Sequence, residues 1–197
     1  MTLKTALLLL NLQKIMTMNF LKHLLYLIAN PVKGWEQIAK YSVPKEIFQA
    51  KLFFPIIGVL AVTSFVQFFY NQDESLAYYL QYSIIKIAQF YFGYIISAYL
   101  LQNIYSKFFT EQDDQNRLHI FVLYNITVLM GISIVENFFP PNMIDIFNVL
   151  PLYVVFIIWK GYSFMNINIP EPRFIIIFTL AIMVPNMILN SFFKLIL

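Results

Sequence analysis

The sequence predicts an all-α integral membrane protein, in which five transmembrane helices follow a cytoplasmic, amphipathic helical N-terminal region. Three observations predict this fold class. Hydrophobic residues make up 60% of the 197 residues, charged residues make up only 12%, and the mean hydropathy is +0.70. A soluble domain of this length could not hide so much apolar surface in one core.

Five apolar stretches are long enough to cross a bilayer, because a spanning helix needs about 20 residues to match roughly 30 Å of hydrocarbon. Short polar or proline-bearing segments separate these stretches, so neighbouring spans should pack antiparallel in a single membrane domain over 52–197. The predicted spans are 52–70, 80–105, 118–139, 143–164 and 174–197.

The distribution of Lys and Arg predicts the orientation, since basic residues that flank spans are retained in the cytoplasm. The loops after the first and third predicted spans contain no Lys or Arg. Most of the 13 basic residues fall on the N-terminal side of the membrane, and they are Lys4, Lys14, Lys22, Lys33, Lys40, Lys45, Lys51, Lys107, Arg117, Lys160 and Arg173. The N-terminus is therefore expected in the cytoplasm and the C-terminus outside.

A helix is predicted to begin at Asn30 and Pro31, because asparagine caps free backbone amides and proline suits the first helical position. Residues 18–51 are expected to form cytoplasmic or interfacial amphipathic helices, which lie in the headgroup plane or dock as a packing cap on the inner ends of the spans. The helical period assigns them the apolar faces Phe20, Leu24, Leu27 and Ile28, and Val32, Trp35 and Ala39. The candidate interaction surface consists of Asn30, Pro31, Lys33, Trp35 and Glu36.

Residues 1–17 contain a short leucine run after Lys4 that is similar to a signal peptide. Polar residues interrupt the run and no small-residue cleavage site follows it. We therefore expect 1–17 to be a non-native or dispensable extension, with the helical pattern beginning at Met18.

Three prolines, Pro55, Pro151 and Pro185, fall inside predicted spans. Each removes a backbone donor and should kink its helix. Such kinks either help the helices pack or serve as a gating hinge.

Charged and polar side chains within the spans are candidates for a functional site, since a charge at the centre of a span costs about 2.5–3.5 kcal/mol. Lys86 begins a polar or small stripe on the second span, and Asn186 and Asn190 share a face of the fifth, where interhelical hydrogen bonds are expected. Lys86 either snorkels to the outer headgroups, forms a structural ion pair, or lines an ion or solute path. The candidate intramembrane cluster is Lys86, Gln89, Glu136 and Asp145.

Several kinds of site are not expected. The chain has no cysteine, and its two histidines, His23 and His119, lie far apart in sequence, so no metal site or cofactor is predicted. It has no Gly-rich phosphate loop, nucleophile elbow or basic patch with groove-reading polar residues. We expect neither an enzyme nor a nucleic-acid-binding protein.

The phrase "NPVKGWEQI" ahead of five spans, with "LPLYVVFIIWKGYSF" and "PEPRF" before the last span, resembles the bacterial branch of the YIP family (Ypt/Rab-interacting proteins, the YIP-one domain). The resemblance covers about Met18 to Leu197, and the matching positions are Asn30, Pro31, Trp35, Tyr153, Gly161 and Pro170. It implies a cytoplasmic N-terminus and five helices.

Eukaryotic members of the YIP family are tied to vesicle traffic and small GTPases. The chain lacks their Asp-Leu-Tyr-Gly-Pro phrase, and its Ile, Asn, Phe, Tyr and Lys content suggests an AT-rich bacterium. We therefore expect a bacterial cytoplasmic (inner) membrane protein with no Rab GTPase partner.

Two functions follow from these features. The first is a non-enzymatic membrane scaffold or bilayer-organising protein, whose partners are the lipid bilayer and a protein partner or second copy. The alternative is a small transporter or channel that uses the outer-half charges Lys86, Glu136 and Asp145.

Overall fold

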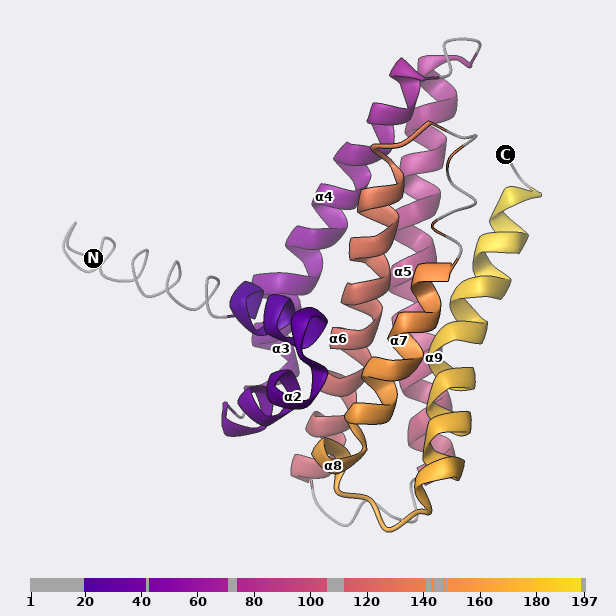
Figure 1. The fold of residues 1–197 in the computed structure, drawn as a ribbon. Helices are drawn as coiled ribbons and strands as arrows, with labels where there is room; N and C mark the ends of the chain where they lie inside the picture. Colours follow the sequence, from indigo (N-terminus) through magenta and orange to yellow (C-terminus); the bar gives the residue numbers. More distant parts are fainter. Residues whose placement is uncertain are drawn as a thin grey trace, which may run out of the picture.

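The computed structural model of the chain describes residues 20–41, 43–70, 74–105, 112–140, 143, 147 and 149–195. All regular secondary structure in these ranges is helical, and the long helices stand side by side in one elongated bundle (Figure 1). The predicted all-α class is confirmed. Four helices are long and apolar enough to cross a membrane, and they are Lys45–Phe69, Leu76–Ile104, Gln115–Glu136 and Glu171–Phe193.

The first of these spans changes its helical geometry along its length. Pro55 lies at the start of its main α-helical part, directly after a five-residue π-helical stretch, and the wider hydrogen-bond pattern accommodates the missing proline amide. At Pro55, where a kink was predicted, the helix is continuous and a π-helical stretch precedes the proline. The successive parts are α3 (Lys45–Phe48), η1 (Gln49–Phe53), α4 (Phe54–Ser64) and the 3₁₀ turn η2 (Phe65–Phe69).

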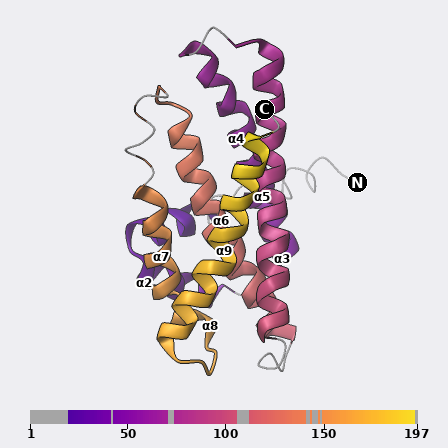
Figure 2. The same ribbon diagram turned by 90° about the vertical axis from the view of Figure 1, so that its right-hand side faces the viewer.

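Three long helices complete the set of four. They are α5 (Leu76–Tyr105), α6 (Gln112–Glu136) and α9 (Glu171–Lys194). Helix α9 packs along α5 and contains Pro185 in its interior, as predicted (Figure 2). These helices extend the predicted 80–105, 118–139 and 174–197 toward their N-terminal ends because polar first turns, such as "QDD" of α6, are also helical.

The predicted span 143–164 is not a single spanning helix in the part of the chain that is described. Helix α7 (Leu150–Lys160) has 11 residues and is followed, after Gly161, by the short α8 (Tyr162–Met165). At 1.5 Å per residue α7 covers about 16 Å, or half of the hydrocarbon thickness. It begins midway along the bundle and runs to the lower end, where α9 starts (Figure 1). The kink predicted at Pro151 is therefore wrong, since this proline lies in the first turn of α7.

Two helices precede the bundle and pack on its lower part, and they are Phe20–Ala29 and α2 (Pro31–Lys40). The predicted start of α2 is confirmed: Asn30 Oδ1 accepts a hydrogen bond from the Lys33 backbone amide at 3.2 Å. The two helices meet closely at Gly34, where an added Cβ would lie 2.5 Å from Leu27 Cα.

The apolar face predicted for α2 is wrong. Val32 is 47% exposed and Ala39 is also exposed, whereas the buried side consists of Pro31, Gly34, Trp35 and Ile38. In the preceding helix, Ile28 is exposed and His23 takes its place in the buried face with Phe20, Leu24 and Leu27. The prediction fails because it does not count Pro31, Gly34 and His23 as core residues. At Gly34 the close approach of Leu27 leaves no room for a side chain.

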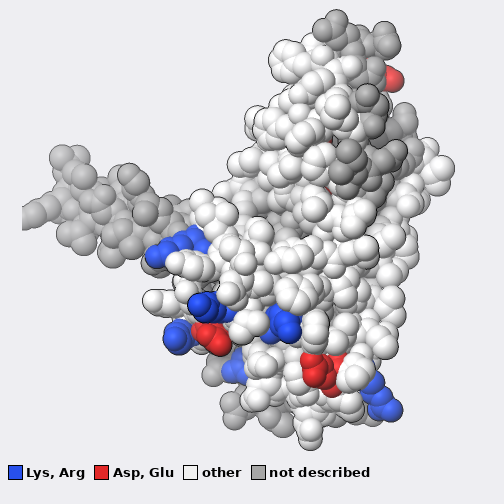
Figure 3. Space-filling model, viewed as in Figure 1, with Lys and Arg blue, Asp and Glu red and all other residues white. Residues whose placement is uncertain are grey.

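Charged residues are unevenly placed along the bundle. On the face shown in Figure 3, the Lys and Arg side chains lie in the lower half, over the N-terminal helices and the lower ends of the long helices. The upper half of this face is almost free of charge among the residues described. The uneven distribution of Lys and Arg along the sequence is therefore also an uneven distribution along the bundle on this face.

Candidate functional site

Trp35 lies inside the protein and holds α2 against the bundle. Its side chain is 2% exposed, and its indole Nε1 donates a hydrogen bond to the Ile157 carbonyl at 2.9 Å. The ring stacks on Phe121 and Phe164, with centroids 4.8 and 4.9 Å away. Aromatic stacking and a satisfied N–H together give a tightly specified contact. Of the two arrangements that the sequence left open, Trp35 adopts docking on the bundle.

Gly161 and Tyr153 complete this contact. We call the whole contact the aromatic dock, and it consists of Trp35, Phe121, Phe164, Gly161 and Tyr153. A Cβ added to Gly161 would lie 2.3 Å from Phe121 Cε2 and 2.9 Å from Trp35 Nε1, so only glycine lets α7 end beneath the rings. The Tyr153 hydroxyl donates to the Ile28 carbonyl at 2.7 Å. The two N-terminal helices are thus bonded to α7.

The candidate interaction surface is therefore divided by the fold. Asn30 caps α2, Pro31 is buried, and Trp35 is buried against the bundle. Lys33 and Glu36 are exposed. Asn30 is exposed as well, so Asn30, Lys33 and Glu36 are the members of this surface that a partner could contact directly.

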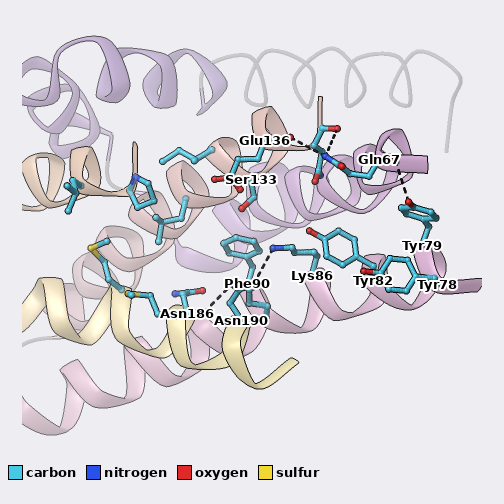
Figure 4. Close-up of a pocket in the computed structure, with 18 residues that line it drawn as sticks. Gln67, Tyr78, Tyr79, Tyr82, Lys86, Phe90, Ser133, Glu136, Asn186 and Asn190 are labelled. Carbon is cyan, nitrogen blue, oxygen red and sulfur yellow. Dashed lines mark hydrogen bonds between the residues drawn. The ribbon is translucent and has the colours of Figure 1, made fainter. Parts of the chain in front are cut away.

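A cavity of about 600 Å³ lies in the upper part of the bundle, above the point where α7 begins. Helices α5, α6 and α9 contribute most of its walls, and η2 and the first turn of α7 contribute the rest (Figure 4). The first turn of α7, with Pro151 and Leu152, borders the cavity from below. Its polar wall consists of Gln67, Tyr78, Tyr79, Tyr82, Lys86, Gln89, Ser133, Glu136, Asn137, Asn186 and Asn190.

Lys86 projects from α5 into this cavity (Figure 4). The residue is 8% exposed, its Nζ donates to Asn190 Oδ1 at 3.5 Å, and the Nζ lies 5.4 Å from the centre of the Tyr82 ring. An amide oxygen and the face of an aromatic ring both favour a cation. The ammonium group therefore lies within the bundle.

Glu136 lies at the upper end of α6 and lines the same cavity. Gln67 holds this helix end, because its Nε2 donates to the carbonyls of Glu136, Asn137 and Phe139 at 3.3, 3.2 and 3.0 Å. Carbonyls at a helix C-terminus lack the amide four residues later, and the Glu136 carbonyl also accepts from the Phe139 backbone amide at 3.1 Å. Asn137 Nδ2 also donates to Thr63 Oγ1 at 3.1 Å, which joins α6 to α4. The carboxylate is thus carried on a helix end that two neighbours fix.

The floor of the cavity is a close contact between α5 and α9. Gln89 Nε2 donates to the Asn186 carbonyl at 3.3 Å, and Asn186 Nδ2 donates to the Ile182 carbonyl at 2.8 Å. A Cβ added to Gly93 would lie 2.2 Å from Asn186 Oδ1. The interhelical hydrogen bonds predicted for the spans are therefore found here, along the stripe that begins at Lys86.

Three of the four residues in the predicted intramembrane cluster, Lys86, Gln89 and Glu136, line this one cavity. Asp145 lies outside the described residues. The tyrosines and Gln67 were not predicted, although Tyr78 and Tyr82 precede Lys86 at intervals of four and could have been assigned to its face.

The cavity offers both charge signs, neutral amides and hydroxyls, together with an apolar wall. The apolar part includes Phe90, Leu129, Ile132, Met183 and Met187. Among the described residues no group of three or more His, Asp or Glu could hold a metal ion. The lining can donate and accept hydrogen bonds and carries one charge of each sign.

Comparisons of the chain with protein-family models, with curated proteins and with solved structures find no match.

Proposed function

We propose that this chain is a non-enzymatic, multi-pass membrane protein that binds a small zwitterionic solute in the upper cavity and acts as a small transporter or channel. The observation that carries the proposal is that Lys86 and Glu136, on different helices, line one cavity within the long apolar helices. Because charges in spans are costly to bury, two of opposite sign that share a cavity indicate a binding role.

The composition of the cavity suggests the class of solute. Lys86 can donate to an anionic group, and Glu136 can accept from a cationic group. Phe90, Leu129 and Met183 offer an apolar surface beside them. The volume falls within the range of small-molecule sites. A zwitterion with a short apolar part, such as an amino acid, meets these conditions.

The proposed topology has five crossings, with a cytoplasmic N-terminus and an external C-terminus in a bacterial cytoplasmic membrane. The fourth crossing contains α7, whose 11 residues cover about half of the hydrocarbon thickness. Reporter fusions after residues 45, 112 and 168 should read cytoplasmic, and fusions after 73, 142 and 197 should read external. A cytoplasmic C-terminus would break the five-crossing arrangement.

The binding proposal is tested with the full chain in lipid nanodiscs. The melting temperature is measured with zwitterionic amino acids, organic cations and organic anions. We expect zwitterions to raise it, and we expect Lys86→Met and Glu136→Gln to abolish the increase. Lys33→Met and Glu36→Gln, which change exposed charges of α2, are the matched controls. The absence of a shift with every class, or a shift that both cavity variants retain, would contradict the proposal.

A second candidate function is a membrane scaffold of the YIP family, which acts on the bilayer with a protein partner or a second copy. One observation favours it: of the residues that carry the resemblance, Trp35 lies against Gly161, and Tyr153 bonds to the Ile28 carbonyl, two residues before Asn30. A Rab GTPase partner is not part of this proposal.

The two candidates predict opposite results in the native host. The experiment complements a deletion strain at matched protein level. The scaffold requires the exposed residues, so the double variant Lys33→Glu, Glu36→Lys should fail while Lys86→Met and Glu136→Gln complement. The transporter requires the reverse. Trp35→Ala is less informative here because the residue is buried and its loss affects folding.

A further inference from the structure

The helical period continues the line of polar residues at the floor of the cavity toward the lower end, on the faces of α5 and α9 that meet there. On α5, Gln89 and Ser97 lie three and eleven residues after Lys86, on the same helical face. On α9, Thr179 lies seven residues before Asn186, also on one face. We call this the polar seam, and it consists of Lys86, Gln89, Ser97, Thr179, Asn186 and Asn190.

The lower part of the polar seam is short of hydrogen-bond partners. Among the described residues, five buried side-chain polar atoms have no hydrogen-bond partner, and four of them belong to α5 and α9. The exception is Asn125 Oδ1 of α6. The four atoms in the seam are Gln89 Oε1, Ser97 Oγ, Thr179 Oγ1 and Asn186 Oδ1. Gln89 is 5% exposed and Ser97 is fully buried, so these groups are well removed from the surface.

Buried hydroxyls in two other long helices have hydrogen-bond partners within their own helix. Ser64 donates to the Leu60 carbonyl at 2.9 Å, and Thr127 donates to the Leu123 carbonyl at 2.7 Å, each within its own helix. The same internal bond is open to any serine or threonine in a helix. Ser97 and Thr179 do not make it. An unpaired buried polar group costs about 1–3 kcal/mol, so a cluster of them on one seam calls for a partner that the protein itself does not supply.

The geometry of α9 adds to this pattern. Pro185 has no amide hydrogen to donate to the Ala181 carbonyl, so the helix is weakened beside the seam. Gly93 lets Asn186 lie directly against α5. The eleven residues from Lys86 to Ser97 span about 16 Å along the helix axis. The seam therefore reaches from the cavity well into the lower half of the bundle.

We propose that water enters the polar seam from the cavity, so that the seam is the lower part of a permeation path for the polar solute. Water can both donate and accept, and a bridging water costs little compared with an unmade hydrogen bond. This inference rests on the proposed function, because it makes the cavity the upper part of a path and not a closed binding site.

The absence of cysteine from the chain allows a direct test by single-cysteine variants in nanodiscs. The reagent is a small, water-soluble, charged methanethiosulfonate, which reacts with a thiol only where water reaches it. Ser97→Cys and Thr179→Cys report on the seam, and Met183→Cys reports on the cavity wall. Val128→Cys is the dry control, since Val128 is 3% exposed in the apolar core of α6. Labelling after unfolding gives the total thiol.

We expect full labelling of the cavity and both seam variants in a time during which Val128→Cys stays unlabelled. Labelling of Met183→Cys with no labelling of Ser97→Cys and Thr179→Cys would overturn the inference while the cavity proposal stands. No labelling at any of the three positions would count against both. Equally fast labelling of Val128→Cys would also overturn the inference, because labelling would then not distinguish the polar seam from the apolar core. Two seam positions on different helices keep the test decisive if one variant does not fold.

Discussion

The aromatic dock at the base of α2 and the cavity at the upper end are built in opposite ways. In the dock, the Trp35 N–H has a partner and its ring is stacked on two others. At the cavity and in the polar seam below it, Lys86 and Glu136 share a space of about 600 Å³, and several buried acceptors have no partner among the described residues. The dock is a closed contact, whereas the cavity leaves bonding capacity for another molecule.

The difference shows how a small membrane protein can separate assembly from function. A dock with every polar group satisfied specifies one arrangement of the N-terminal helices. A cavity with unsatisfied groups is costly to the folded state, and such costs are kept where they serve binding. Substitutions in the dock should therefore lower stability, and substitutions of Lys86 and Glu136 should change binding while the fold persists.

The largest expected effect is that of Trp35→Ala, because removal of a buried Trp side chain costs about 3–5 kcal/mol. The loss includes the hydrogen bond to Ile157 and both ring contacts. The melting temperature in nanodiscs and the protein level in cells should both fall. Trp159→Ala is the matched control, since Trp159 is 39% exposed and should cost much less. Similar losses for the two tryptophans would refute the assignment of Trp35 as the buried anchor.

Gly93→Ala should lower the stability by about 1–3 kcal/mol, because the added methyl overlaps the Asn186 amide at the α5–α9 contact. Gly131→Ala on α6 is the control, because a Cβ added there would have no neighbouring atom within 4 Å and alanine favours helix. Thermal unfolding of both variants and of Gly93→Ala combined with Asn186→Ala is measured. The double variant should recover most of the loss. Additive losses would show that the two residues are not in contact.

Gln67→Ala should lower the free energy of unfolding by about 1 kcal/mol, because the Gln67 side-chain amide donates to three carbonyls at the end of α6. The effect should be local, and hydrogen exchange should become faster in the last turn of α6, which carries Glu136. Gln67→Glu keeps the size but removes the donor, so it should behave like alanine. Protection in Gln67→Glu equal to that of the parent would rule out the hydrogen bonds as the cause.

The smallest expected effect is a dependence on pH at the N-terminal helices. Burial, and to a lesser extent the Lys22 cation, lower the pKa of His23 below its usual value, and the ring packs against Tyr41 with centroids 5.1 Å apart. A lowered pKa means that the unfolded segment binds the proton more readily than the docked one. Docking should be fully stable above the ordinary histidine pKa and weaken as the pH falls below it.

This dependence is measured by limited proteolysis of the N-terminal segment from about pH 7.5 to about pH 5, a range that brackets the ordinary histidine pKa. Cleavage should become faster at the acidic end. His23→Leu should remove most of the change. A cleavage rate in the parent protein that does not vary with pH would contradict the linkage to His23.

Local sequence signals predicted some of these features well. Asn30 and Pro31 fixed the start of α2, because a cap depends on neighbouring residues only. The stripe that begins at Lys86 predicted a close helix contact on that face of α5, but not that α9 would be the partner. The four long helices were recognisable from hydropathy.

Features that depend on distant residues were not predictable from one sequence. The burial of Trp35 depends on Phe121 and Gly161, which lie far along the chain. The short α7 was hidden, because the apolar residues before it continue the hydropathy of a span. Asp145 is not described, so its place beside Lys86 stays a prediction. The roles of the two charges in transport also stay predictions.

The hydrogen bonds of the aromatic dock join residues that are far apart in the order of synthesis. Trp35 is 122 positions before Ile157, and Ile28 is 125 positions before Tyr153. The N-terminal helices are made first, yet they can complete these contacts only after α7 has left the ribosome and entered the membrane. A nascent or truncated chain that lacks α7 would present Trp35 without its partners. The dock therefore distinguishes a completed chain from an unfinished one, and an exposed Trp35 face would be a surface for quality-control factors to bind.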